Sequence, residues 1–149
     1  MYYGVYSNSA VGLNALATDS LGFYNTAKGA LSLLNNESGN ENTAAGNAAL
    51  YKNINGSYNS AFGYAALQAN FSGDYNVAVG AYALYNGYSS QNNTAVGYNT
   101  LYSSTTGFNN TALGYSSLYK CTGGLQNTSV GYNAGSNVTH GHANTFIAT

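Results

Sequence analysis

"NNTAVGYNTLYSSTTGF", residues 92–108, is followed directly by "NNTALGYSSLYKCTGGL", residues 109–125. The two stretches have equal length and share Asn-Asn-Thr-Ala-x-Gly-Tyr, a Leu-Tyr pair and a late glycine. A fixed period is the signature of a repeat architecture. The second Asn of the motif recurs every 17 residues, at Asn8, Asn25, Asn42, Asn59, Asn76, Asn93, Asn110, Asn127 and Asn144.

The period divides the chain into three parts. Eight full repeats cover residues 8–143, and a partial ninth repeat covers residues 144–149. Residues 1–7 precede them and are predicted to form an assembly or junction segment. Neither end resembles the polar cap that protects the terminal coils of a solenoid. This favours subunits that stack end to end, although a segment of a longer protein is an alternative.

The repeat positions, numbered from the recurring Asn as position 1, show which residues face inward. Position 5 is Gly in all eight repeats, position 3 is Ala in seven, and position 9 is Leu in seven. Residues two apart lie on one face of a strand, so positions 1, 3 and 5 are expected inside. Position 4 accepts Lys28 and Phe62 and is expected outside. The predicted structural ladder comprises Asn25, Asn42, Asn59, Asn76, Asn93, Asn110, Asn127, Gly63, Gly80, Gly97, Gly114, Leu50, Leu67, Leu84, Leu101 and Leu118.

The length and composition of the repeat predict an all-β fold. Seventeen residues are too few for the helix pairs of helical repeats, and Gly and Asn disfavour helix. Two short strands and two turns fit this length. Stacked coils would form a parallel β-solenoid of eight coils, in which the recurring Asn side chains make amide hydrogen-bond ladders.

The composition excludes several classes of protein. Only 5% of residues are charged, against about 25% in an average globular protein. The chain has three Lys and no Arg, which argues against a nucleic-acid partner. The 14% of aromatic residues argues against disorder. No apolar run approaches the roughly 18 residues of a membrane span, so membrane insertion is not expected.

No constellation of side chains predicts catalysis. Paired carboxylates that face each other across a substrate are the mark of a glycosidase, and no such pair is indicated. His140 and His142 share a face if they lie on a strand, but no third metal ligand is evident. Cys121 is expected to be a surface or half-buried thiol. We therefore predict no enzymatic activity, no metal and no cofactor. The four carboxylates are Asp19, Glu37, Glu41 and Asp74.

Tyrosine recurs at positions 6 and 10 and predicts aromatic ridges along the rod. Tyr is favoured at protein interfaces, so these ridges are expected to join chains. Aromatic faces beside Asn and Thr also suit carbohydrate, which gives adhesion as an alternative. A Thr-rich column at position 2 makes ice binding a distant third hypothesis. The candidate assembly or adhesion surface comprises Tyr51, Tyr64, Tyr85, Tyr98, Tyr102, Tyr115, Tyr119 and Tyr132.

The repeat resembles a motif of known fibrous proteins. Asn-Thr-Ala-Val-Gly-Tyr-Asn-x-Leu, at residues 93–101, is similar to the Asn-Ser-Val-Ala-Ile-Gly motif in head domains of trimeric autotransporter adhesins. Similar repeats occur in phage tail fibres. The resemblance covers residues 8–148 and implies a left-handed parallel β-roll, three chains side by side, and display outside a cell or on a virion. The adhesin repeats are shorter and place one more residue between Asn and Gly.

Together these observations predict a non-enzymatic extracellular fibre or filament subunit. Its main partner is expected to be itself, as a trimer or an end-to-end filament, with adhesion as a second role. The alternative is a segment of an adhesin head or tail fibre that binds a host glycan or a surface receptor.

Overall fold

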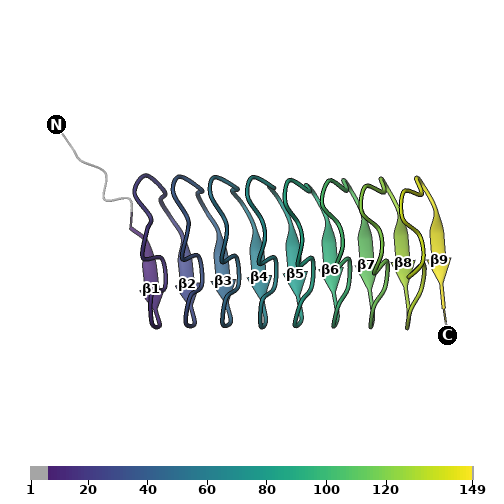
Figure 1. Cartoon of the computed structure of the whole chain (residues 1–149), viewed down its shortest axis with the longest axis horizontal. Coiled ribbons are helices and arrows are strands. Elements are labelled where there is room, and N and C mark those ends of the chain that lie inside the picture. Colours follow the sequence, from purple (N-terminus) through teal and green to yellow (C-terminus); the bar gives the residue numbers. More distant parts are fainter. Residues whose placement is uncertain (1–6, 149) are drawn as a thin grey trace.

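The computed structural model describes residues 7–148 and shows a rod of stacked coils (Figure 1). The nine strands form one parallel sheet in sequence order. Each strand residue pairs with the residue 17 positions later, as Ala61 does with Ala78. The predicted fold class, an all-β parallel solenoid with a 17-residue period, is therefore confirmed. The strands are β1 (Ser9–Val11), β2 (Thr26–Lys28), β3 (Thr43–Ala45), β4 (Ser60–Phe62), β5 (Val77–Val79), β6 (Thr94–Val96), β7 (Thr111–Leu113), β8 (Thr128–Val130) and β9 (Thr145–Ile147).

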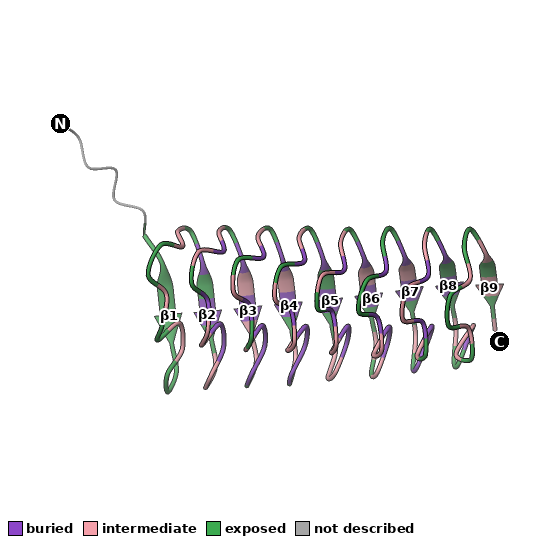
Figure 2. Ribbon diagram, turned by 45° about the horizontal axis from the view of Figure 1, so that its top comes forward, coloured by how far each residue is buried: buried purple, intermediate pink, exposed green. Residues whose placement is uncertain are grey.

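The faces of each strand follow the repeat positions. Position 3 points inward, and Ala61, Ala78 and Ala95 are completely buried. Position 4 points outward, and both Lys28 and Phe62 are exposed there, as expected. Figure 2 shows that buried residues recur at the same place in successive coils. We number the coils 1 to 8, each beginning at its position-1 Asn.

Each coil contributes one strand, not the two that were expected. Positions 7, 9 and 17 adopt positive φ, as in Tyr82 (57°), Leu84 (50°) and Asn92 (55°) of coil 5. A left-handed residue cannot continue an extended strand. The coils still exchange backbone hydrogen bonds in this half, for example from Leu84 N to Thr100 O at 2.9 Å. The second strand is reduced to single bridging residues at position 16, namely Gln91, Phe108, Leu125 and His142.

Glycine at position 5 is required by both conformation and space. Gly97 has a φ of 134°, a region that residues with a Cβ rarely adopt. A Cβ on Gly97 would lie 2.4 Å from the carbonyl oxygen of Gly114 in the next coil. The close approach of successive backbones thus explains why this position never varies.

A single column of leucines fills the core. The position-9 side chains from Leu33 to Leu118 are fully buried, one per coil. In coil 8 this position is Gly135, and Phe146 from β9 occupies the space instead. A Cβ on Gly135 would lie 2.9 Å from Phe146 Cδ2, so the two departures from the repeat compensate each other.

Residues 7–148 contain no helix that is long and apolar enough to cross a membrane. The proposed assembly segment at residues 1–7 lies outside the described residues except for Ser7.

Candidate functional site

The position-1 asparagines form a continuous ladder inside the rod. Asn76 Nδ2 donates to Ser90 O at 2.8 Å and to Asn59 Oδ1 at 3.1 Å. The backbone N–H of Asn76 also donates to Asn59 Oδ1, at 3.0 Å. The same pattern recurs from Asn42 to Asn127, and these amides are buried. The ladder satisfies buried backbone groups and offers nothing to a ligand.

A second asparagine ladder, at position 12, was not foreseen. Asn53 Nδ2 donates to Asn36 Oδ1 at 2.7 Å, and Asn70 Nδ2 donates to Asn53 Oδ1 at 2.6 Å. The same Nδ2 atoms bond the carbonyl oxygen of Gly56 or Gly73 at position 15 of their own coil. The three asparagines lie 17 residues apart, so the signal was present in the sequence.

This second ladder ends at coil 5, where Gly87 takes position 12. Ser90 takes position 15 of the same coil, and its Oγ would lie 3.1 Å from a Cβ on Gly87. Coil 5 therefore has glycine at position 12 and the polar residue at position 15, which is the reverse of coils 2 to 4. Among residues 7–148, two buried hydroxyl oxygens have no hydrogen-bond partner, those of Ser90 and of Ser104 in the next coil.

Cys121 occupies the same interior column in coil 7. It is completely buried, so the expected surface or half-buried thiol is wrong. Burial raises the pKa of the Cys121 thiol, and a hydrogen bond with the Gly124 backbone opposes this only in part. The position-12 side chain points into the rod, which explains why a thiol fits where other coils place Asn or Ser.

The carboxylates serve local structure. Asp19 accepts hydrogen bonds from Gly22 N at 3.1 Å and Asn36 Nδ2 at 2.8 Å, and Asp74 accepts one from Ser57 N at 2.7 Å. Glu41 lies beside Tyr58, and its negative charge is the main cause of the raised pKa of that phenol. Glu37, in coil 2, is exposed.

The two histidines are exposed on coil 8. His140 Nε2 lies 3.2 Å from Thr122 Oγ1, whereas His142 bridges Leu125 through its backbone. Within the part of the chain that the structure describes, no three His, Cys, Asp or Glu side chains gather where a metal could be held.

Six of the eight predicted tyrosines form two stacks on the outside of coils 5 to 8. At position 10, the ring centroids of Tyr85 and Tyr102 lie 4.9 Å apart, and those of Tyr102 and Tyr119 lie 5.3 Å apart. At position 6, Tyr98 stacks on Tyr115 at 5.4 Å. Tyr132 continues this second stack, with its ring centroid 5.1 Å from that of Tyr115.

The other two predicted tyrosines lie apart from these stacks. Tyr51 is followed at position 10 of the next coil by Gln68, so its column is interrupted. Tyr64 instead meets Tyr82 edge to face at 5.2 Å. Tyr82, at position 7, was not among the predicted surface tyrosines because it lies outside both Tyr columns. Its ring also contacts Tyr85 and Tyr98, which places it between the two stacks.

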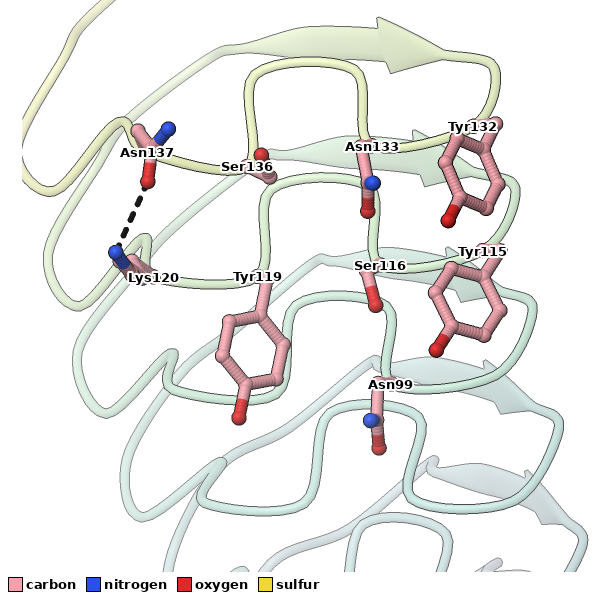
Figure 3. A pocket seen from close by; sticks show the side chains of 9 residues that line it. All are labelled: Asn99, Tyr115, Ser116, Tyr119, Lys120, Tyr132, Asn133, Ser136 and Asn137. Atoms are coloured by element: carbon pink, nitrogen blue, oxygen red, sulfur yellow. Dashed lines mark hydrogen bonds between the residues drawn. The ribbon is translucent and has the colours of Figure 1, made fainter.

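A groove, called the Tyr groove, runs between the two stacks. Its first hollow, of about 430 Å³, lies among Tyr82, Tyr85, Tyr98 and Tyr102. Its second hollow, of about 410 Å³, is lined by both aromatic and polar residues (Figure 3). Asn99 and Tyr119 line both hollows, so they form one continuous depression.

Two phenols of the groove, those of Tyr82 and Tyr102, have a raised pKa and are neutral at neutral pH. Burial is the main cause of the raised pKa of Tyr82 and Tyr102, and neighbouring phenols raise it further. Their neutral hydroxyl groups can both donate and accept hydrogen bonds.

No protein-family model matches the chain, and neither a curated protein nor a solved structure is significantly similar to it. Its function is therefore inferred from the residues themselves.

Proposed function

We propose that the chain is a non-enzymatic structural subunit of an extracellular fibre, which associates with copies of itself along the outer face of its sheet. The observation that carries this proposal is an exposed apolar column at position 4. The column runs unbroken through six successive strands, β4 to β9, which is about 24 Å at a strand spacing of about 4.8 Å. Its members are Phe62, Val79, Val96, Leu113, Val130 and Ile147.

A continuous apolar stripe on an exposed sheet is unusual for a chain that acts alone. Large exposed apolar patches mark interaction surfaces. A second copy is the best-matched partner, because its own column has the same 17-residue period and therefore the same spacing between side chains. Lys28 is the single charged residue at this position, and it lies outside the unbroken run.

Lateral association and end-to-end growth are compatible in this fold. The sheet is linear, from β1 to β9, so its two edges lie at opposite ends of the rod (Figure 1). A subunit stacked on either end would continue the same parallel ladder. A trimer displayed on a cell or virion is the arrangement that the resemblance to adhesin heads and tail fibres implies.

The outer sheet face is a better candidate for assembly than the tyrosine ridges. Each Tyr side chain of the ridges carries a hydroxyl group that can hydrogen-bond with water, so the ridges are less apolar than the position-4 column. The six side chains of the position-4 run carry no polar group and remain exposed.

The proposal is tested by light scattering after size-exclusion chromatography, with negative-stain imaging at high concentration. The wild-type chain should form oligomers or fibres. Val96→Glu places a charge in the middle of the apolar run and should shift the population to monomers. The matched control is Val11→Glu, at position 4 of coil 1, which should leave assembly unchanged. A wild-type chain that stays monomeric at high concentration would refute the proposal.

A further inference from the structure

The position-10 stack of tyrosines ends inside the Tyr groove. Tyr102 is covered on both sides, by Tyr85 and by Tyr119. Tyr119 is covered by Tyr102 on one side only, because the next coil carries Ser136 at this position. Tyr119 and Ser136 both line the 410 Å³ hollow, so we infer that the uncovered side of the Tyr119 ring lies at this hollow. The hollow thus occupies the place where one more ring of the stack would lie.

The walls around this open face are polar. Asn133, Ser136 and Asn137 line the hollow from coil 8, and Tyr132 lies across from Tyr119 (Figure 3). Lys120 Nζ donates a hydrogen bond to Asn137 Oδ1 at 2.9 Å, which fixes both side chains at the rim. Lys120 is the single charged residue of the lining. The site therefore combines one apolar ring face with several amide and hydroxyl groups.

We propose that this hollow binds a pyranose ring of a neutral oligosaccharide. One face of a pyranose carries C–H groups and can stack on the apolar face of Tyr119. Its hydroxyl groups lie around the edge of the sugar ring, where the amides of Asn133 and Asn137 and the hydroxyl of Ser136 can hydrogen-bond with them. The remaining sugars extend along the groove toward Asn99.

A carbohydrate fits this lining better than an aromatic side chain of a partner protein. An aromatic side chain would cover Tyr119 but would leave the surrounding amides and hydroxyls desolvated without new partners, which is unfavourable. A sugar satisfies them. A volume of about 410 Å³ lies within the range of pockets that bind small molecules. This inference goes beyond the fibre role and does not depend on assembly.

The proposal is tested by saturation-transfer NMR and calorimetry. The probes are maltotriose, cellotriose, mannotriose and the trimer of N-acetylglucosamine, with N-acetyltryptophanamide as an aromatic probe. At least one trisaccharide should bind the wild-type chain with a Kd of about 0.1–1 mM, which corresponds to about 4.1–5.5 kcal/mol. The aromatic probe should bind more weakly.

Two variants test the position of the site. Ser136→Tyr adds the next ring of the stack and fills the hollow, and Tyr119→Ala removes the platform. Each should weaken binding at least tenfold. The matched control, Tyr51→Ala, removes a tyrosine at the same repeat position outside the groove and should leave binding unchanged.

Circular dichroism of each variant separates loss of binding from loss of fold. If one variant unfolds, the other variant still tests whether the hollow is the sugar-binding site. The proposal is overturned if no trisaccharide binds the wild-type chain, if the folded variants bind as well as the wild type, or if only the aromatic probe binds. A chain that binds sugar but stays monomeric would support this inference while refuting the fibre role.

Discussion

Coils 2 to 4 and coils 5 to 8 share one backbone design but stabilise it differently. In coils 2 to 4, the position-12 asparagines Asn36, Asn53 and Asn70 form a second amide ladder inside the rod. In coils 5 to 8, this column changes to smaller or apolar residues, and the position-6 and position-10 tyrosines stack on the outside. Coils 5 to 8 thus lack the second interior ladder and carry two outer stacks, whereas coils 3 and 4 carry one stacked pair outside, Tyr58 on Tyr75 at 4.9 Å.

The comparison shows which parts of the repeat define the coil and which can vary. The position-1 ladder, the position-5 glycine and the position-9 leucine persist through both regions until coil 8 replaces the leucine. The position-12 column and the outer positions differ between the regions without any change of register. Variation at these positions leaves the coil intact and lets one region acquire a groove.

The largest expected effect is the same in both regions. Gly46→Ala in coil 3 and Gly97→Ala in coil 6 each place a Cβ within 2.3–2.4 Å of a carbonyl oxygen in the next coil. Both positions also have a φ above 130°. We expect a loss of more than about 4 kcal/mol in the free energy of unfolding for each, measured by urea denaturation. A tolerated alanine in either coil would show that this glycine does not define the fold.

Substitutions at position 12 should change the free energy of unfolding in opposite directions in the two regions. Asn53→Ala leaves the buried Asn36 Oδ1 without its donor, whereas Gly56 O keeps Asn42 Nδ2 and Asn70 Nδ2 keeps Gly73 O. This variant should destabilise by about 1–3 kcal/mol. Ser104→Ala removes a buried hydroxyl that has no partner and should stabilise by roughly 0.5–1 kcal/mol. Urea midpoints measured side by side decide this, and equal losses in both variants would contradict the comparison.

Substitutions of the position-15 glycines test the same difference between the two regions, with a smaller expected effect on stability. A Cβ on Gly56 would lie 2.4 Å from Asn70 Nδ2 and 2.5 Å from Gly73 O, whereas one on Gly107 meets its nearest atom, Ser104 Oγ, at 2.7 Å. Gly56→Ser should therefore cost more than about 2 kcal/mol, and Gly107→Ser about 1 kcal/mol or less. The reverse order of their thermal midpoints would mean that the position-12 asparagine does not exclude a side chain here.

The smallest effect concerns pH and the tyrosine stacks. Burial and the neighbouring phenols of Tyr85 and Tyr119 raise the pKa of Tyr102 above its ordinary value of about 10. The folded chain therefore holds this proton more tightly than the unfolded chain, and the stabilisation present below pH 10 is lost as the pH rises through the raised pKa. Tyr102→Phe should reduce the fall in thermal midpoint between pH 9 and pH 11. An unchanged fall would mean that Tyr102 does not contribute to it.

The inward-facing positions of the repeat could be predicted because the same residue type recurs there in nearly every coil. The inward placement of Ala at position 3 and Leu at position 9 follows directly from this repetition. Cys121 was misplaced because its column changes identity along the rod, so no single copy reveals that position 12 points inward. The left-handed residues at positions 7, 9 and 17 were missed because Leu, Tyr and Asn alike occupy them. Only the absence of β-branched side chains at these positions marks them.

The Tyr groove was only partly predictable. The recurrence of Tyr at positions 6 and 10 predicted two ridges, but it did not show that the rings stack face to face. The distance between the ridges depends on how the coil bends at its left-handed residues, which a sequence pattern does not give. Tyr82 and Ser136, which fill one end of the groove and open the other, are exceptions to their columns and become meaningful only in the structure.

Both asparagine ladders point in one direction along the rod. Asn53 donates its side-chain N–H to Asn36 in the preceding coil, and Asn93 donates in the same sense to Asn76. Aligned amide dipoles add, as the peptide dipoles of a helix do, so the positive end of each column faces coil 1. The rod is therefore electrically polar along its axis.

A single carboxylate lies at the positive end of both columns. Asp19 Oδ1 accepts a hydrogen bond from Asn36 Nδ2, and Asp19 Oδ2 accepts one from Asn8 Nδ2. Asp19 is thus a counter-charge for two amide columns at once, in the way that an acidic residue serves the N-terminus of a helix.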